Sequence, residues 1–218
     1  MELLIATLAH IRPAYEIDAQ SQVRQVTESL RPTPGLLSVR SYASRDRRYH
    51  LLLSTWENEE VWRKVRERCS PARLLQEMAG PQLMDVPEQW AMRYIWGYVR
   101  PAVSPTLAVA LLARVHPEQA ETIEQHWLES LHRQAAELLM ASAFLARGQE
   151  EAGLQAGDSR EGERHEPGYQ RWGAVFLNLL SWASEIEQEE FYTQPSYQNF
   201  NLQLHQAALV QMLALEQP

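Results

Sequence analysis

One short pattern occurs twice in this chain: an apolar run that ends in tryptophan and is followed at once by an acidic segment. It reads TWENEEVWRKV at residues 55–65 and SWASEIEQEEF at residues 181–191. Asn58 and Ser184 are residue types that cap the first free backbone N–H groups of a helix, and the glutamates behind them suit its positive end. The repeat predicts two copies of one unit, in which a strand runs into a capped helix.

The first half of the chain alternates between strand and helix periods. Residues 3–12 are apolar and stop at Pro13, which is typical of a strand buried on both faces. The next segment has apolar residues at helical spacing, namely Ala19, Val23, Val26 and Leu30. The spacing then predicts strands at residues 36–45 and 49–56, a helix interrupted near Ser70 and Pro71, and a last strand within residues 89–100.

The second half repeats this order. Strands are expected at residues 106–116 and 143–151, in a run that ends at Trp182, and at residues 207–216; helices are expected from Pro117 and from Ser184. A polar, glycine-rich stretch predicts a flexible insertion at about residues 150–168. The order is therefore βαββαβ in each half, which is ferredoxin-like. We expect an α+β chain with tandem domains at residues 1–100 and 106–218, joined by a proline-containing linker at residues 101–105.

The composition of the chain limits its expected cellular environment and the kinds of partner that it can bind. The formal net charge is −8, and this acidity argues against nucleic acid as a partner. No apolar stretch is long enough to span a bilayer, and the N-terminus lacks the basic start of a signal peptide, so a cytoplasmic protein that does not enter membranes is expected. The single cysteine, Cys69, cannot form an intramolecular disulfide.

Two segments carry a resemblance to a known family. They are TPGLLSVRSYASRDRRYHLLLSTWENEEVW in the first half and YQRWGAVFLNLLSWASEIEQEEFYTQPSYQNF in the second. Their strand, terminal tryptophan and acidic helix start resemble the antibiotic biosynthesis monooxygenase-like family. Members of that family pair as dimeric α/β barrels, in which two sheets face each other. The resemblance implies that this tandem chain forms the barrel alone, as a monomer with an internal pseudo-two-fold axis; a homodimer of such chains is the alternative.

The resemblance also implies a cavity between sheet and helices in each half. Some relatives oxidise polycyclic phenols with molecular oxygen and no cofactor, and others degrade haem. Residues 59–79 and 185–200 contain no histidine for a haem ligand, so no cofactor or metal is expected. We therefore predict a cofactor-independent, monooxygenase-like enzyme that acts on an aromatic or apolar small molecule. The alternative is a non-catalytic, small-molecule-binding or stress-related module of the same fold.

Candidate site residues come from the third strand of each half. Alternation places one set on a common face, namely His50, Leu52, Ser54 and Trp56, and the corresponding set is Phe176, Asn178, Leu180 and Trp182. His50 is a candidate proton acceptor because its ordinary pKa lies near neutrality, and Asn178 is an amide inside an apolar strand. These two are the predicted catalytic residues. The alternative for both is a structural side chain that is hydrogen-bonded in the core.

Three further side chains are predicted to bind substrate. Trp56 and Trp182 could stack on an aromatic ligand or anchor the core. Arg93 could steady an oxyanion or pair with an acidic helix residue. The last strand of the first half also carries four aromatic residues of one parity, namely Trp90, Tyr94, Trp96 and Tyr98. We expect this aromatic face to fill the interface between the two sheets or to line a pocket there.

Overall fold

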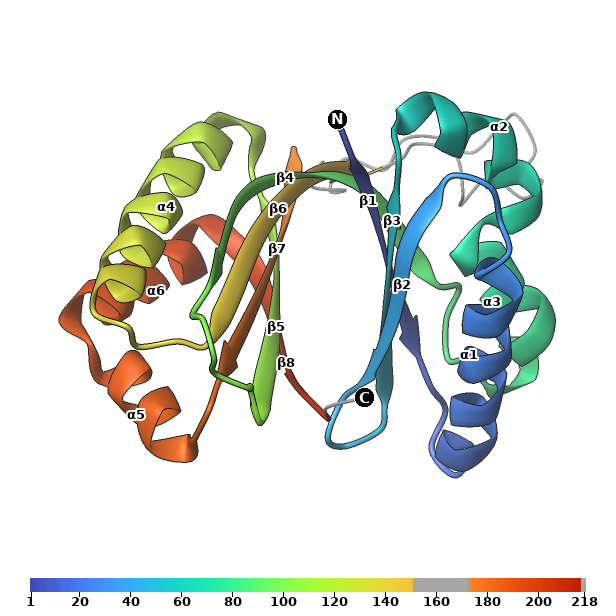
Figure 1. Ribbon diagram of the computed structural model, residues 1–218, viewed down its shortest axis with the longest axis horizontal. Coiled ribbons are helices and arrows are strands. Elements are labelled where there is room, and N and C mark those ends of the chain that lie inside the picture. The colour runs from blue at the N-terminus through green and yellow to red at the C-terminus, as the bar shows by residue number, and fades with distance from the viewer. Residues whose placement is uncertain (151–172, 217–218) are drawn as a thin grey trace, which may run out of the picture.

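The computed structural model describes residues 1–150 and 173–216 as one eight-stranded antiparallel sheet with helices on its outer faces (Figure 1). The first half contains β1 (Leu3–His10), α1 (Glu16–Leu30), β2 (Leu36–Ala43), β3 (Tyr49–Trp56), α2 (Glu59–Cys69), α3 (Pro71–Ala79), the 3₁₀ turn η1 (Gly80–Gln82) and β4 (Glu88–Val99). The second half contains β5 (Leu107–Val115), the 3₁₀ turn η2 (Pro117–Gln119), α4 (Ala120–Ala136), β6 (Ser142–Glu150), β7 (Ala174–Trp182), α5 (Glu185–Thr193), α6 (Pro195–Ala207) and β8 (Ala208–Leu215). The predicted insertion falls on residues 151–172, which lie outside the described residues.

The twofold βαββαβ order is confirmed, and a proline divides the second helical region of each half. Ser70 and Gln194 precede Pro71 and Pro195 and have extended ψ angles of 120° and 128°. A residue before proline avoids the helical conformation because the proline ring clashes with its backbone. The predicted caps are also confirmed, since Asn58 Oδ1 accepts from the Val61 N–H at 2.9 Å. Ser184 Oγ accepts in the same way from the Glu187 N–H at 3.2 Å.

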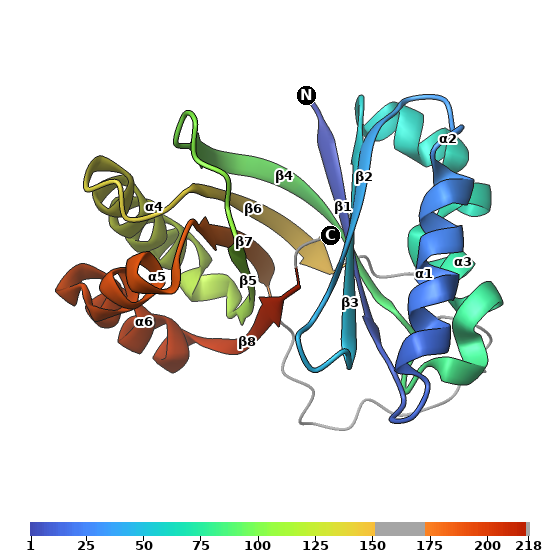
Figure 2. The same cartoon turned by 60° about the horizontal axis from the view of Figure 1, so that its bottom comes forward.

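The strand order shows the internal symmetry. It runs β2-β3-β1-β4-β6-β7-β5-β8, so the second half repeats the order of the first, and the last strand of the first unit, β4, pairs with the first strand of the second, β6. These two strands pair from Trp90 to Val99. They arch over the top of the molecule in Figure 1, and the two four-stranded halves descend from them and face each other. Helices α1–α3 cover the outside of one half and α4–α6 the outside of the other (Figures 1 and 2). The sheets thus face each other in one chain, as the resemblance implied.

The two seams between the halves are unequal. By the same symmetry, β2 and β8 are the counterparts of β6 and β4, but in the described part of the chain their backbone pairing is limited to an isolated bridge between Ser44 and Leu215. Backbone hydrogen bonds of 2.8 Å flank this bridge, from Arg45 N to Ala214 O and from Glu216 N to Ala43 O. The barrel is therefore closed along β4–β6 and held at one point along β2–β8.

Apolar side chains fill three spaces. An inner cluster lies between the facing sheets and includes Leu8, Leu51, Trp90, Leu112, Leu177 and Leu213. Outer clusters lie between each half-sheet and its helices; the second half's includes Ile123, Trp127, Phe176, Trp182, Phe191 and Phe200. The first half's outer side chains form an aliphatic cluster that includes Val23, Val26, Leu52 and Leu75, and a second cluster of Ile5, Trp56 and Trp62. Because both faces of the central strands are covered, these strands are apolar on both sides.

A bulge divides the aromatic residues of β4 between two faces. The β4–β6 register shifts between Tyr94 and Trp96, so residues beyond the shift change sides. Tyr94 lies on the inner face, with its ring 5.5 Å from that of Phe144. Trp96 lies on the outer face, where its ring meets His132 of α4 at 5.6 Å. The expectation of one aromatic face was wrong, because simple alternation does not hold across a bulge.

Candidate functional site

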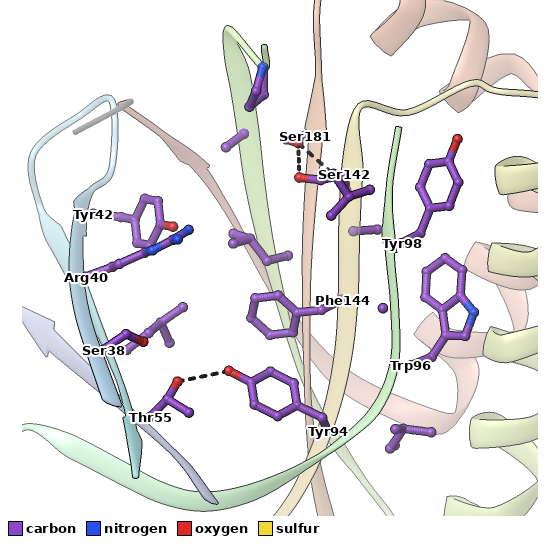
Figure 3. Close-up of a pocket in the computed structure, with 18 of the residues that line it drawn as sticks. Ser38, Arg40, Tyr42, Thr55, Tyr94, Trp96, Tyr98, Ser142, Phe144 and Ser181 are labelled. Carbon is purple, nitrogen blue, oxygen red and sulfur yellow. Dashed lines mark hydrogen bonds between the residues drawn. The ribbon is translucent and has the colours of Figure 1, made fainter. Parts of the chain in front are cut away.

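A cavity of about 850 Å³ opens between the two facing half-sheets (Figure 3). Its walls come from the inner faces of β2 and β3 on one side and of β6 and β7 on the other, and β4 bridges them. The side chains that shape it include Ser38, Arg40, Tyr42, Leu53, Thr55, Tyr94, Phe144 and Leu179. A concave, largely apolar space of this size with a few polar groups suits a small organic molecule. We call it the inter-sheet cavity.

A pair of hydroxyl groups from β3 and β4, two strands of the first half-sheet, lies in this cavity. Tyr94 Oη and Thr55 Oγ1 are 3.1 Å apart, and either atom could be the donor. The Tyr94 side chain is 39% exposed, and Phe144 meets its ring edge-on, so the phenol is held on one side and open on the other. The bulge in β4 is what turns Tyr94 inward. This arrangement can offer a ligand oxygen a hydrogen bond beside an aromatic surface.

Two serines provide polar groups in the wall from the second half. Ser142 Oγ on β6 and Ser181 Oγ on β7 are 2.6 Å apart, and Ser181 Oγ also donates to the Ser142 carbonyl oxygen at 3.2 Å. These hydroxyl groups satisfy each other, so the wall is polar without leaving a buried group unpaired. The serines therefore form part of the cavity wall, and their hydrogen bonds do not require a ligand.

Arg40 and Glu2 are the charged side chains that line the inter-sheet cavity within the described part of the chain. Arg40 extends from β2 into the space between the sheets in Figure 3. Its neighbours of equal parity, Ser38 and Tyr42, also line the cavity. Sequence reasoning missed Arg40, although the alternation in SVRSY was a signal for a polar inner face on this strand.

His50 faces the opposite side of the first half-sheet. It follows Tyr49 and precedes Leu51, whose side chains join the inner cluster, so alternation points His50 toward α1. The imidazole is 3% exposed, and its Nε2 has no hydrogen-bond partner among the described residues. Burial lowers the pKa of His50 to about 4, against the opposing charge of Glu216, so the ring is neutral at pH 7.

A second hollow, of about 600 Å³, lies where His50 meets α1 and β2. Its lining is mainly polar and includes Gln20, Ser21, Arg24, Thr27, Glu28, Ser41 and Glu216. The predicted sheet-to-helix cavity thus has a counterpart in the first half, at the edge of the sheet. A neutral imidazole in its wall can accept a proton, but Tyr42 is the one other aromatic ring in the described lining, which leaves little aromatic surface for a polycyclic substrate.

Both polar atoms of the Asn178 side chain form hydrogen bonds within the second half. Its Nδ2 donates to the Phe144 carbonyl oxygen at 2.8 Å, and its Oδ1 accepts from the Trp127 indole N–H at 3.3 Å. The side chain is 1% exposed. It therefore joins β7, β6 and α4 as a structural bridge, and the geometry favours the structural alternative given for it above.

Trp56 and Trp182 are both completely buried against helices. The Trp56 indole donates to Ser54 Oγ at 3.1 Å, and its ring lies 5.1 Å from that of Trp62. Trp182 meets Phe191 at 5.3 Å, within a group of aromatic rings that fills the space between sheet and helices in the second half. Neither indole lines a described cavity, which fits core anchors better than ligand-binding surfaces.

Arg93 lies on β4 and is exposed. It pairs in register with Arg147, whose guanidinium is held by Glu121 and Glu124 at 2.7 and 2.6 Å. Arg93 is not among the residues that line the inter-sheet cavity. The structure therefore does not bring the five predicted site residues together: His50 lines the first-half hollow, three are packed in cores, and Arg93 is on the surface.

Two general features concern metals and membranes. Among residues 1–150 and 173–216, no group of histidine, cysteine, aspartate and glutamate side chains could hold a metal ion. No helix in the described part of the chain is long and apolar enough to cross a membrane.

Comparison with known proteins identifies the fold. The sequence matches no protein-family model and no curated protein. Among solved structures, an anthrone oxidase-like protein is similar at a TM-score of 0.69 and 13% identity, over 99% of this chain and 90% of the other. A Fusobacterium nucleatum protein provisionally named a monooxygenase gives 0.65 and 9%, over 99% and 91%. A Listeria monocytogenes ferredoxin-fold protein related to antibiotic biosynthesis monooxygenases gives 0.52 and 10%, over 100% and 97%.

These matches extend over the full length of single chains on both sides. The protein therefore has the tandem ferredoxin-like fold of proteins related to antibiotic biosynthesis monooxygenases, with both copies in one chain. The TM-scores of 0.65 and 0.69 show a shared fold, and at identities of 9–13% the comparison shows the fold alone.

Proposed function

We propose that this protein is a monooxygenase-like enzyme that binds a phenolic aromatic molecule in the inter-sheet cavity and oxidises it with molecular oxygen without a cofactor. The observation that carries this proposal is the Tyr94–Thr55 hydroxyl pair, 3.1 Å apart, beside the Phe144 ring in an open cavity of about 850 Å³. The similarity in fold to an anthrone oxidase-like protein supports the same class of substrate.

The reaction balances without an external reductant. In an anthrone-type substrate, a ring CH₂ group becomes a carbonyl group: one atom of O₂ forms the new C=O bond, and the other leaves as water with the two hydrogen atoms. The substrate is oxidised and O₂ is reduced. Removal of the first proton creates an electron-rich enolate or phenolate, and this anion reacts with O₂. The protein must therefore bind the ring, accept a proton and steady the negative oxygen.

The lining residues can serve these roles. Phe144 and Tyr94 provide aromatic surface, and the Tyr94–Thr55 pair can donate a hydrogen bond to the oxygen on which charge develops. Glu2 is the only carboxylate that lines the cavity in the described part of the chain, and we assign it the role of proton acceptor. One chain supplies both walls, so the active species in this proposal is a monomer with residues 1–100 and 106–218 as its two domains.

The alternative is a binding module that does not catalyse. It is favoured by one observation: no histidine lines the inter-sheet cavity among the described residues, and the buried neutral imidazole of His50 lies on the other face of the sheet. Such a protein would bind the same aromatic molecules and leave them unchanged. Binding and turnover must therefore be measured separately.

The test combines ligand titration with oxygen uptake, using anthrone as substrate and 9-anthracenemethanol as an unreactive binding probe. We expect the full chain to quench the probe's fluorescence saturably, and Phe144→Ala to weaken binding about fivefold through lost ring contact. Anthrone should drive oxygen consumption above the buffer rate, and Tyr94→Phe should lower it by roughly tenfold or more. Leu202→Ala, an exposed change on α6 away from both described hollows, is the control. Binding without oxygen uptake would establish the alternative, and absence of both would reject the proposal.

A further inference from the structure

The placement of Arg40 puts a positive charge close to the hydroxyl pair of the inter-sheet cavity. On the β2–β3 ladder, Arg40 pairs with Leu53 and Ser38 pairs with Thr55. Arg40 is thus one diagonal position from Thr55 on the inner face, a separation of roughly 7–8 Å between backbones that a long side chain spans easily. The cation and the Tyr94–Thr55 pair therefore border the same part of the cavity.

Arg40 also differs from other arginines that border the sheet. The guanidinium of Arg100 is 2.7 Å from Glu187, and Arg114 pairs with Glu88. The Arg147 guanidinium is bound by two glutamates. Arg40 has no ion pair or hydrogen bond from its side chain to any residue in the ranges 1–148 and 173–216, and Glu2, the other charged residue of the lining, does not pair with it. The cavity thus presents an arginine whose charge is not neutralised by any side chain in the described part of the chain.

We propose that the inter-sheet cavity selects aromatic molecules that carry an anionic group, and that Arg40 is the residue that binds this group. The inference rests on the proposed function, in that it requires the cavity to bind an aromatic molecule. The planar guanidinium matches a carboxylate or sulfonate with two parallel hydrogen bonds. The ring lies against Phe144 and Tyr94, a neutral oxygen of the ligand meets the Tyr94–Thr55 pair, and the anionic group lies toward β2. The ligand class is therefore a fused-ring aromatic acid.

The experiment compares two probes with the same ring system and different charge. Anthracene-9-carboxylate and 9-anthracenemethanol are titrated into the full chain, and binding is followed by fluorescence. The wild type should prefer the carboxylate. Arg40→Ala should weaken carboxylate binding by roughly fivefold to tenfold and leave the alcohol unchanged, a modest factor because the arginine is exposed. Arg40→Lys should keep part of the preference, since it keeps the charge and loses the planar fork.

Arg93→Ala is the matched control, since Arg93 is also an exposed arginine of the first half-sheet but lies outside the cavity lining. It should leave both affinities unchanged, and thermal melts should show all variants folded. Equal binding of the two probes to the wild type, with no effect of Arg40→Ala, would overturn the inference while aromatic binding stands. A loss of preference in Arg93→Ala instead would also overturn it. Failure of both probes to bind would reject the proposed function, and this inference with it.

Discussion

On the helix-facing sides of the two half-sheets, residues at equivalent strand positions lie in different environments. His50 in β3 pairs with Ala9 of β1, and Phe176 in β7 pairs with Ala113 of β5, so the two residues are structural counterparts. Phe176 packs on Trp127, with ring centres 5.6 Å apart. His50 instead borders a hollow of about 600 Å³. The fold fixes the position, and side-chain volume on the covering helix decides whether that position is core or cavity wall.

The same contrast holds one step further along the strands. Leu52 occupies the first-half position that Asn178 occupies in the second, and only the asparagine ties its strand to a helix by hydrogen bonds. At these positions the second half therefore has aromatic packing and one amide bridge, whereas the first half has aliphatic contacts and a buried polar ring; the Trp56–Trp62 pair lies in a separate cluster. Changes that exchange or remove these features test whether the contrast is real.

The largest effect is expected from Trp182→Ala. This side chain is fully buried and its ring meets Phe191 and Tyr192 at 5.3 and 5.6 Å, so truncation leaves a large void. We expect the free energy of unfolding to fall by about 3–5 kcal/mol. Urea denaturation measures this, with Trp56→Ala as the first-half equivalent. A loss below about 1 kcal/mol, with weakened ligand binding, would show that the indole contacts ligand rather than core.

A smaller effect concerns the pH dependence that His50 confers. Its pKa is about 4 in the folded protein and 6.5 in the reference state, so the unfolded chain takes up the proton first as the pH falls. The stabilising contribution is complete above pH 6.5 and is lost as the pH falls toward 4. Between pH 7 and 4, wild type should lose about 2–3 kcal/mol more stability than His50→Phe, which installs the second-half residue. His50→Gln is the control for ring volume, and parallel pH profiles in all three proteins would contradict a buried neutral histidine.

The third effect follows from Asn178→Leu, which installs the first-half residue at the second-half position. The change leaves the Trp127 indole N–H and the Phe144 carbonyl oxygen without their partners in a buried place. We expect a loss of about 2 kcal/mol in the free energy of unfolding, measured by urea denaturation. A double variant with Trp127→Phe, which removes the indole N–H, should recover part of this loss. If the single change is neutral, the amide bridge does not stabilise the second half.

The periodicity of apolar residues in the sequence was sufficient to predict the helices and strands and their order. The switch from helical spacing in α1 to the strand patterns of β2 and β3 is local, and the caps Asn58 and Ser184 act within four residues. The breaks before Pro71 and Pro195 also have a local cause, because proline restricts the residue before it. Features that depend on neighbouring residues in the chain can thus be derived from the sequence alone.

The site could not be derived in the same way, because it depends on which distant segments meet. The bulge after Tyr94 is a property of the β4–β6 ladder, and alternation along one strand does not reveal it. Arg40 becomes a cavity residue only because β2 lies across from β6 and β7. Conversely, Asn178 looks like a catalytic amide in sequence, and its partners Trp127 and Phe144 are far from it along the chain.

The unequal seams have a consequence for how such a protein can evolve. In a two-fold dimer of identical single domains, every substitution appears twice, so the two seams must remain equal. In this chain the partners are encoded separately: β4 and β6 close one seam along Trp90–Val99, while Ser44 and Leu215 form a single bridge at the other. Duplication has thus released each copy from the constraints of the other. One seam can keep the architecture intact while the other accumulates changes that alter access to the space between the sheets.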